Sequence, residues 1–502
     1  MKRLPFPVPK RSLSFLVSLT LLILTACAGC SSHDDSTATN TYAYSMLAPG
    51  QNGSTIIYAR IVLDAENQSC PELKGSDGST LTTRLRAMYP NSVTRSARFP
   101  VTVCEAVMEE GVSYAALGTT AMLNAVTLAA SRVQVYGDSG CEASDCPGQT
   151  PSTQFQALAN LGAEQPPDVI LHMGDYNYRG TSGAITGSIY AYDAGDGDSG
   201  GSSCGLQETY YSQNAANSPR PDAWPNWQAD FFDAAQNLLS QAPWVFARGN
   251  HELCSRAGPG WFYFFGPGSS LPGAGQAQMQ CPDQGNFDAP PETAEQHIAM
   301  IPPYMLSLGS LDVWVMDTAN ACDALATNAL TAQYQAQYEA LATSIKNTTW
   351  IMSHRPIWGF QKSDEPTVNQ MLQTALAHST AGALPSNVQL SLAGHMHIFE
   401  SLSFLQDSAR PPQIVIGNSG VKLSHHPAKH VFVETVDGEQ AQGNAMREFG
   451  FLSASVANGV WSGEILSTTG STLLNCDSRN IVNELRICLP ATDTNFGPGP
   501  GE

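Results

Sequence analysis

The sequence predicts an α/β fold in which two sheets form a sandwich flanked by helices, preceded by a small all-β, sandwich-like domain. From residue 131 onward, short apolar runs alternate with stretches of helical period, and several late runs follow one another closely. Alternating elements indicate α/β layers with parallel strands, whereas closely spaced strands indicate an antiparallel portion. A two-sheet sandwich accounts for both patterns better than a plain doubly wound sheet.

The individual elements follow from apolar period and from bounding turn residues. The runs expected to form strands are 132–137, 168–174, 244–249, 311–318, 349–354, 388–394 and 413–417. Helices are expected between them at 153–163, 227–241, 326–348 and 366–378. The antiparallel strands are expected at 429–435, 449–456 and 459–467.

The domain limits follow from changes in this pattern. Residues 42–130 contain β-branched runs bounded by turn residues, at 56–63 and 99–107, and no catalytic constellation. We therefore expect an all-β accessory domain over 42–130, within which 119–130 fits a helix or a strand. The limits expected for the rest are a catalytic domain at 131–470 and a C-terminal disulfide hairpin with a tail at 471–502.

A long segment rich in Gly, Ser, Asp and Asn spans 179–222. Segments of this length without secondary structure are usually functional or disordered. Because it follows the GDYNY motif directly, it is expected either to fold over the mouth of a site or to form a surface loop.

The N-terminus has the features of a targeting segment. Residues 1–26 combine a basic start with an apolar stretch too short for a transmembrane helix, and their last three residues form the letters LTAC with Cys27. This ending resembles a bacterial lipobox, which implies cleavage before Cys27, lipidation of Cys27 and a flexible tether over 27–41. Ala28 favours the outer membrane, on its periplasmic or cell-surface side. An ordinary secretory signal is the alternative, and both predict export.

Cysteine content agrees with export. Of the 12 cysteines, Cys27 and Cys30 lie in the expected tether, which leaves ten for disulfides in an oxidising compartment. Spacing favours the pairs Cys70–Cys104, Cys141–Cys146 and Cys476–Cys488. The pairing among Cys204, Cys254, Cys281 and Cys322 stays open.

The net charge of −20 argues against a nucleic-acid partner, because a phosphate backbone requires a basic surface. It does not exclude a phosphorylated small molecule, since bound metal ions would supply positive charge locally. No protein partner is indicated.

Polar motifs recur where the apolar runs end. They are GDSG (137–140), GDYNY (174–178), GNHE (249–252), SHRP (353–356) and GHMH (394–397). The carboxyl ends of strands are where α/β sheets build their sites. Carboxylates, an amide, imidazoles and one phenol form a donor set suited to two metal ions, which need an anionic bridge between them.

The order of these motifs resembles the calcineurin-like metallophosphoesterases, specifically their purple acid phosphatase-like branch, over roughly residues 131–420. The resemblance implies a metallophosphoesterase sandwich with two metal ions. The ligands it implies for the first metal are Asp138, Tyr178 and His397, and for the second Asn250, His354 and His395. Asp175 would bridge the metals, and His251 would contact phosphate and help to protonate the leaving group.

One departure from the commoner Asp-x-His pattern suggests which metal binds. Gly140 stands where the His would be, and Tyr178 supplies a phenol three residues after Asp175. A phenol ordinarily ionises near pH 10, so a phenolate ligand favours a strongly charged metal. We therefore expect Fe(III) at the first site and Zn, Mn or Fe(II) at the second.

Several residues have weaker assignments. Arg355 is expected to pair with phosphate or with Glu252, and Glu252 is expected to orient His251. His172 lies inside a strand-like run and is expected in the core. A solvated loop is the more ordinary interpretation of a late histidine group, with a substrate-facing rim as the alternative: His425, His426 and His430.

These features predict an exported, membrane-anchored hydrolase of phosphate monoesters, in which a metal-bound hydroxide attacks phosphorus in line. A phosphodiesterase or phospholipase would use the same metals with a wider cleft. A non-catalytic surface lipoprotein is the alternative of another class, because a fold alone does not establish activity. Plant-type purple acid phosphatases carry further histidines after the ligand at His354, and none follows here before His378, which leaves the general acid open beyond His251.

Overall fold

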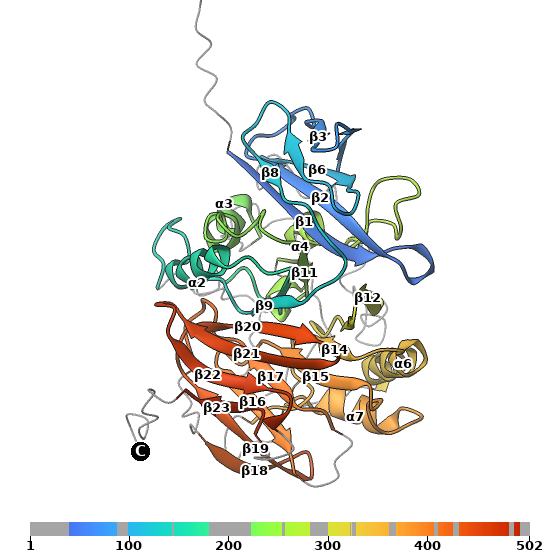
Figure 1. Ribbon diagram of the computed structural model, residues 1–502, viewed down its shortest axis with the longest axis vertical. Coiled ribbons are helices and arrows are strands. Elements are labelled where there is room, and N and C mark those ends of the chain that lie inside the picture. Colours follow the sequence, from blue (N-terminus) through green and yellow to red (C-terminus); the bar gives the residue numbers. More distant parts are fainter. Residues whose placement is uncertain are drawn as a thin grey trace, which may run out of the picture. The chain divides into compact units, whose positions relative to one another are not determined.

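Two large sheets form the framework of the protein in the computed structural model (Figure 1). The described residues all belong to the unit Asn40–Glu502. They are 40–87, 99–142, 145–179, 222–253, 257–281, 300–321, 323, 328–360, 368–405, 410–424, 431–480 and 486–491. The expected signal peptide, Cys27 and most of the tether lie outside them, as does nearly all of the 179–222 segment.

The first sheet has 11 strands in the order β23-β22-β21-β20-β9-β10-β11-β1-β2-β6-β5. Its parallel centre consists of β9 (Arg132–Tyr136), β10 (Val169–His172), β11 (Trp244–Phe246) and β1 (Thr41–Pro49). Antiparallel strands flank this centre: β2 (Thr55–Leu63), β6 (Thr102–Val107), β5 (Arg84–Leu85), β20 (Gly450–Ala457), β21 (Val460–Ser467), β22 (Thr472–Asp477) and β23 (Cys488–Pro490).

The second sheet has eight strands in the order β12-β13-β14-β15-β17-β16-β19-β18. Its parallel part is β13 (Leu311–Val315), β14 (Thr349–Met352), β15 (Val388–Ala393) and β17 (Gln413–Ile416). The antiparallel strands are β12 (Tyr304–Leu308), β16 (Phe399–Phe404), β19 (Glu439–Met446) and β18 (Phe432–Val436).

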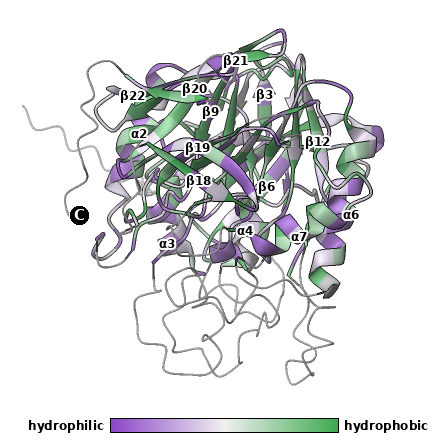
Figure 2. Ribbon diagram, turned by 90° about the horizontal axis from the view of Figure 1, so that it is seen from below, coloured by the Kyte–Doolittle hydropathy of each residue, from purple (hydrophilic) through white to green (hydrophobic). Residues whose placement is uncertain are grey.

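Alternation along the second sheet explains how the layers pack. In β13, Val313 belongs to the core cluster shared with the first sheet, whereas Trp314 belongs to a second cluster on the opposite face. Successive side chains of a strand point to opposite faces, so a sheet buried on both sides reads as a continuous apolar run. Figure 2 shows this as hydrophobic colour along most strands, with hydrophilic residues more frequent on the outer helices.

Helices cover the outer faces. On the second sheet, α6 (Asn328–Ser344) and α7 (Gln370–His378) contribute Tyr334, Leu341 and Leu372 to the outer cluster and lie beside β14 and β15 (Figure 1). On the first sheet, α2 (Thr153–Glu164), α3 (Trp224–Trp227) and the π-helix η4 (Gln228–Phe232) cover the centre. The expected α/β sandwich flanked by helices is thus present, and every strand predicted from residue 131 onward is found.

The N-terminal segment differs from the expectation of a separate all-β domain over 42–130. Met46 of β1 pairs in parallel with Trp244 of β11, so β1, β2, β6 and β5 extend the sheet that carries the catalytic motifs. Both faces of β1 are buried, which is the pattern of an inner strand. The strands that form a separate four-stranded sheet are β4 (Thr80–Leu81), β3 (Leu73–Gly75), β7 (Tyr114–Ala116) and β8 (Met122–Leu123).

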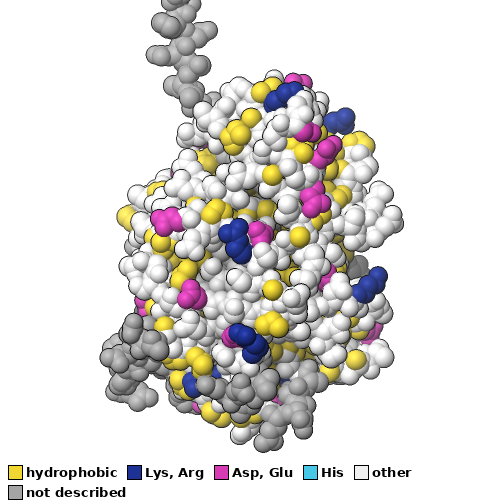
Figure 3. Space-filling model, viewed as in Figure 1, with side chains coloured by type: hydrophobic (Ala, Val, Ile, Leu, Met, Phe, Trp, Pro, Cys, Tyr) yellow, Lys and Arg dark blue, Asp and Glu magenta, His cyan; other side chains and the backbone are white. Residues whose placement is uncertain are grey.

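The three disulfides favoured by spacing are confirmed: Cys70–Cys104, Cys141–Cys146 and Cys476–Cys488. The last of these joins β22 to β23, so the expected terminal hairpin is an edge of the first sheet. None of the described helices is long and apolar enough to span a membrane. On the face drawn in Figure 3, charged side chains are few, and several basic side chains lie next to acidic ones.

A buried ionic cluster joins β2 and β6 to the end of α4 (Gly258–Phe264). The Glu105 carboxylate lies 3.2 Å from Arg60 and 3.0 Å from Arg86. Both guanidinium groups also donate to backbone carbonyls of residues 262–268, which supplies partners for the last carbonyls of the helix. Burial alone would raise the pKa of Glu105, but Arg60 and Arg86 hold it at about 2.

This cluster predicts an acid-dependent loss of stability. Because the folded pKa of Glu105 is depressed from 4.5 to about 2, its contribution is complete above pH 4.5 and is lost as pH falls toward 2. The difference corresponds to on the order of 3 kcal/mol. Urea unfolding of the wild type and of Glu105→Gln should show a stability gap at pH 6 that narrows by pH 3. A gap of constant size would contradict the assignment.

Candidate metal centre

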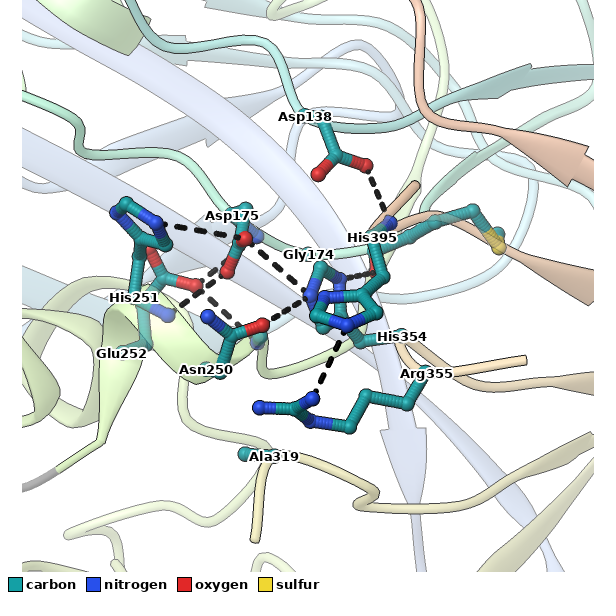
Figure 4. A network of polar contacts seen from close by, with 12 residues as sticks. Asp138, Gly174, Asp175, Asn250, His251, Glu252, Ala319, His354, Arg355 and His395 are labelled. Carbon is teal, nitrogen blue, oxygen red and sulfur yellow. Dashed lines mark hydrogen bonds and ion pairs between the residues drawn. The ribbon is translucent and has the colours of Figure 1, made fainter. Parts of the chain in front are cut away.

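The ends of five parallel strands bring the polar motifs to one place. Asp138 follows β9, Asp175 follows β10, and η5 (Asn250–Glu252) follows β11 in the first sheet. The motifs with His354 and His395 follow β14 and β15 of the second sheet. Figure 4 shows the side chains from both sheets converging on one another.

Four donors form the first set. The Tyr178 Oη lies 2.9 Å from Asp138 Oδ1, 3.0 Å from Asp175 Oδ2 and 2.9 Å from His397 Nε2. His397 Nε2 lies 3.6 Å from Asp138 Oδ1. The residues that the sequence assigned to the first metal are therefore assembled, and a cation among these atoms would contact two carboxylates, a phenol and an imidazole.

A second set shares one atom with the first. His354 Nε2 lies 3.2 Å from Asp175 Oδ2 and 2.8 Å from Asn250 Oδ1. His395 completes the group with Asp175 and His354, their donor atoms lying within 4.8 Å of one another. Because Asp175 Oδ2 faces both sets, Asp175 has the position of a bridging carboxylate.

The atoms that face away from the two sets are held by the protein. Asp175 Oδ1 accepts the backbone N–H of His251 at 2.8 Å, and Asp138 Oδ2 accepts that of His395 at 2.8 Å. His354 Nδ1 lies 2.8 Å from the carbonyl oxygen of Met173. An imidazole that donates through one nitrogen presents the other to a metal, so this contact orients His354 Nε2 inward.

The backbone at the site is strained. Asp138, Asp175, His395 and His397 have φ values of 55°, 57°, 76° and 50°. Non-glycine residues seldom adopt this left-handed region, and such residues cluster at functional sites where surrounding structure enforces them. Four of the sequence-assigned ligands therefore adopt a conformation that their packing imposes.

Gly140 and Tyr178 occupy the same space. A Cβ atom on Gly140 would lie 2.6 Å from Tyr178 Cδ2 and 2.6 Å from the carbonyl oxygen of Tyr176. A histidine at position 140 therefore has no room while the Tyr178 ring is in place. The sequence showed a missing histidine at position 140 and an added phenol at Tyr178, and the packing explains why the two occur together.

The electrostatics of the site call for cations. Asp138 and Asp175 are fully buried, and among the described residues they form ion pairs only with histidines. Burial and the neighbouring Asp175 raise the pKa of Asp138 well above its usual range, and burial with both carboxylates does the same to the pKa of Tyr178. Two buried carboxylates without a fixed positive partner are costly. This donor set therefore fits two metal ions.

His251 lies at the edge of the site. Its ring centroid is 3.9 Å from that of Tyr178, its Nε2 is 4.0 Å from Asp175 Oδ2, and its Nδ1 is 3.2 Å from the carbonyl oxygen of Asn177. The Asn177 carbonyl can accept only a proton-bearing nitrogen. His251 is thus held with Nε2 toward the shared carboxylate.

Glu252 holds the loop that carries Asp175. The Glu252 carboxylate accepts the backbone N–H groups of Asp175 at 3.0 Å, Tyr176 at 2.9 Å and Gly249 at 3.1 Å. Burial and the charge of Asp175 raise the pKa of Glu252 to about 8, while these N–H donors oppose the shift. Glu252 therefore joins the ends of β10 and β11.

Arg355 pairs with a carboxylate that the sequence reasoning missed. Its Nη1 lies 2.6 Å from Asp323 Oδ2, a partner that the sequence, which suggested phosphate or Glu252, did not indicate. Burial alone would raise the pKa of Asp323, but Arg355 and His395 lower it far below its usual range. Asp323 lies well beyond the end of β13 at Val315, so the strand-end rule that found the ligands does not reach it.

Asp230 is a second residue that was missed. It lies in the π-helix η4, a form that often marks functional sites, and its Oδ2 accepts the backbone N–H of Tyr178 at 3.0 Å. Its other oxygen pairs with Arg179, which also donates to the carbonyl of Cys146 in the Cys141–Cys146 loop. The backbone of Tyr178 is therefore held by Asp230, on the side of the loop that faces η4. Nothing in the local sequence of the helix indicates this role.

Four further histidines were assigned outside the ligand set. His172 is buried as expected, stacked on Tyr176 with its Nε2 2.8 Å from Ser139 Oγ. The late histidines expected in a solvated loop or at a rim lie outside the described residues: His425, His426 and His430.

The shared carboxylate predicts how metal binding responds to mutation. Asp175→Asn should abolish binding of both metals, whereas His397→Ala should spare the second, because only Asp175 faces both sets. Bound metal should raise the melting temperature of the wild type by mass action, by an amount lost in Asp175→Asn. Metal content and thermal shifts measure both effects, with Asp168→Asn, distant from the site, as control. Retention of two metals by Asp175→Asn would refute the bridging role.

The comparison with known families agrees with this geometry. The model of the calcineurin-like phosphoesterase family matches residues 132–399, more than half of the chain. This span runs from β9 to the start of β16 and contains both donor sets. No curated protein matches the sequence. The chain belongs to the calcineurin-like phosphoesterase family, whose members are generally metal-dependent hydrolases.

Proposed function

We propose that the protein is a dinuclear-metal phosphoesterase of the purple acid phosphatase-like branch that hydrolyses phosphate monoesters. The observation that carries the proposal is the position of Tyr178. Its hydroxyl lies within 3.0 Å of Asp138, Asp175 and His397, on the side left open by Gly140. A phenol in place of an imidazole is the feature that separates this branch from other metallophosphoesterases.

The ligand chemistry supports iron at the first site. Burial and two carboxylates raise the pKa of Tyr178, so a metal must displace a tightly held proton to bind the phenolate. A ferric ion has the charge density for this, as in Tyr-ligated iron elsewhere. The second set has one shared carboxylate, two imidazoles and an amide, which suit Zn, Mn or Fe(II).

The residues around the metals suggest how hydrolysis would proceed. When bound, the two metals would clamp the phosphate, supply the nucleophile and neutralise the leaving oxygen. Asp175 would hold both ions at a fixed separation. In its imidazolium form, with Nδ1–H held by the Asn177 carbonyl, His251 would donate its Nε2 proton to the departing oxygen and be left as the neutral ring. Both carboxylates and His251 are buried, whereas the His397 side chain is partly exposed, so substrate would enter from the side of His397.

The proposed location is outside the cytoplasm, with a lipid anchor on Cys27 in a bacterial membrane, the outer membrane favoured. The basic start, the apolar stretch and the LTAC ending of the N-terminal segment support this proposal, as does the confirmed use of cysteines in disulfides. The substrate would be a phosphorylated small molecule. A nucleic-acid substrate is disfavoured by the acidic net charge.

The phenolate assignment predicts a coloured protein. Iron-loaded protein should show a violet charge-transfer band that disappears in Tyr178→Phe, because Phe removes the phenolate oxygen while keeping the ring that packs on Gly140. Visible absorption and iron content measure this, and Tyr176→Phe, whose hydroxyl bonds the carbonyl of Ala247, is the matched control. A colourless iron-loaded wild type would remove Tyr178 from the ligand set.

Substrate preference tests the monoesterase proposal. The zinc- and iron-loaded enzyme should cleave a mono-aryl phosphate faster than the matching bis-aryl phosphate. His251→Ala should lower kcat by about 100-fold or more, because it removes the proton donor. The loss should be smaller for a substrate whose leaving group needs no proton. Faster cleavage of the diester would instead identify a phosphodiesterase or phospholipase.

A further inference from the structure

We propose that Asp323 is a positioning residue for the second metal, and that its carboxylate fixes His395 in the form that presents Nδ1 to the ion. The inference rests on the proposed two-metal function. It concerns a residue outside the motif set, on the segment after β13.

Asp323 contacts His395 directly. Its Oδ2 lies 2.7 Å from His395 Nε2 and 2.6 Å from Arg355 Nη1, so one oxygen is shared between a histidine and a guanidinium. The other oxygen accepts the side-chain N–H of Asn369 at 2.7 Å. The main-chain carbonyl of Asp323 accepts the N–H of Gln370 at 2.8 Å. The carboxylate is therefore tied to the start of α7 and cannot turn away from the imidazole.

These contacts determine which nitrogen of His395 carries the proton. His395 Nε2 lies nearer to Asp323 Oδ2, which can only accept, at 2.7 Å, than to Arg355 Nη1, which can only donate, at 3.0 Å. Since Arg355 Nη1 already donates to the same carboxylate oxygen at 2.6 Å, the nearer, negatively charged Asp323 decides the state of Nε2. Nε2 therefore bears hydrogen, and the lone pair of the neutral ring is on Nδ1. Metal-binding histidines are commonly oriented by such a carboxylate, which also increases the basicity of the ring.

The other histidines of the site do not need this help. His354 is oriented by the Met173 carbonyl, which is part of the main chain after β10. His397 directs its Nε2 toward Tyr178 at 2.9 Å. His395 Nε2, in contrast, faces side chains that come from other segments, those of Asp323 and Arg355.

Arg355 has a supporting part in this arrangement. Its Nη1 is 3.0 Å from His395 Nε2 (Figure 4) and 2.6 Å from Asp323 Oδ2, and its side chain is buried. Arg355 thus supplies the positive charge that keeps Asp323 ionised beside the imidazole. Its guanidinium is engaged with the protein at the position where the sequence suggested a phosphate contact.

The test is a Zn²⁺ titration of iron-loaded protein carrying Asp323→Asn. The amide has the same shape as the carboxylate, but it can either accept a hydrogen bond from Nε2 or donate one to it. His395 is therefore no longer held in one tautomer. We expect the affinity for Zn²⁺ to fall by about 10- to 100-fold. The violet band of the first site should be unchanged, because Asp323 does not contact its donors.

Asp317→Asn is the matched control. Asp317 is buried, and like Asp323 it follows β13 and pairs with an arginine, Arg248 at 3.0 Å, but no histidine of the described residues contacts it. Zn²⁺ affinity should stay within about twofold of wild type in this variant. An equal loss in both variants would show that the effect is general destabilisation and would overturn the proposal.

A second measurement reads the tautomer itself. In metal-free protein labelled with ¹⁵N-histidine, the His395 signals, assigned with His395→Ala, should show a protonated Nε2 that changes in Asp323→Asn. An unchanged tautomer would overturn the proposal. If wild-type protein binds two metals but hydrolyses no phosphate ester, the proposed function fails while these results still decide the role of Asp323.

Discussion

Two buried carboxylates at the ends of neighbouring parallel strands determine much of this structure. Asp138 and Asp175 lie against the Tyr178 hydroxyl and three imidazoles, and the described residues pair neither with lysine or arginine. Groups of this kind are tolerated in an interior only with strong compensation. The backbone donors on their outer oxygens provide part of it, and cations at the shared oxygen would provide the rest. Both residues have a left-handed backbone, which turns their carboxylates toward the same group of donors.

The sandwich makes the convergence possible. Each sheet has a parallel centre, and the carboxyl ends of both centres open on the same side, so ligands come from β9, β10 and β11 in one sheet and from β14 and β15 in the other. Behind the ligands, carboxylates connect neighbouring segments: Glu252 joins the ends of β10 and β11, and Asp230 joins η4 to the Tyr178 loop. These supports therefore tie each ligand-bearing loop to a second element of the fold.

The sequence predicted the ligands because strand ends are readable from apolar runs and the residues after them. Asp138, Asp175 and His354 were found in this way, and the geometry brings them together. Supports were harder to predict, since Asp323 and Asp230 reach the site from segments whose placement depends on tertiary packing. Arg355 was expected to pair with phosphate or Glu252 because it stands next to a ligand in the sequence. In the structure it pairs with Asp323, which comes from the segment after β13. The accessory domain was wrongly separated because a strand's sheet partners are not visible in its own pattern.

The place of β1 in the first sheet bears on how the chain reaches its fold. β1 pairs with β2 over its whole length, from Thr41 opposite Leu63 to Pro49 opposite Thr55, so this hairpin is local and can form early. Its other edge must wait for β11, which lies far downstream in the chain. Long-range parallel pairing is slow, and a waiting apolar edge can pair with another chain. Refolding from denaturant should therefore give the highest yield in dilute solution, where a second chain rarely reaches the open edge of β1 before β11 of the same chain pairs with it.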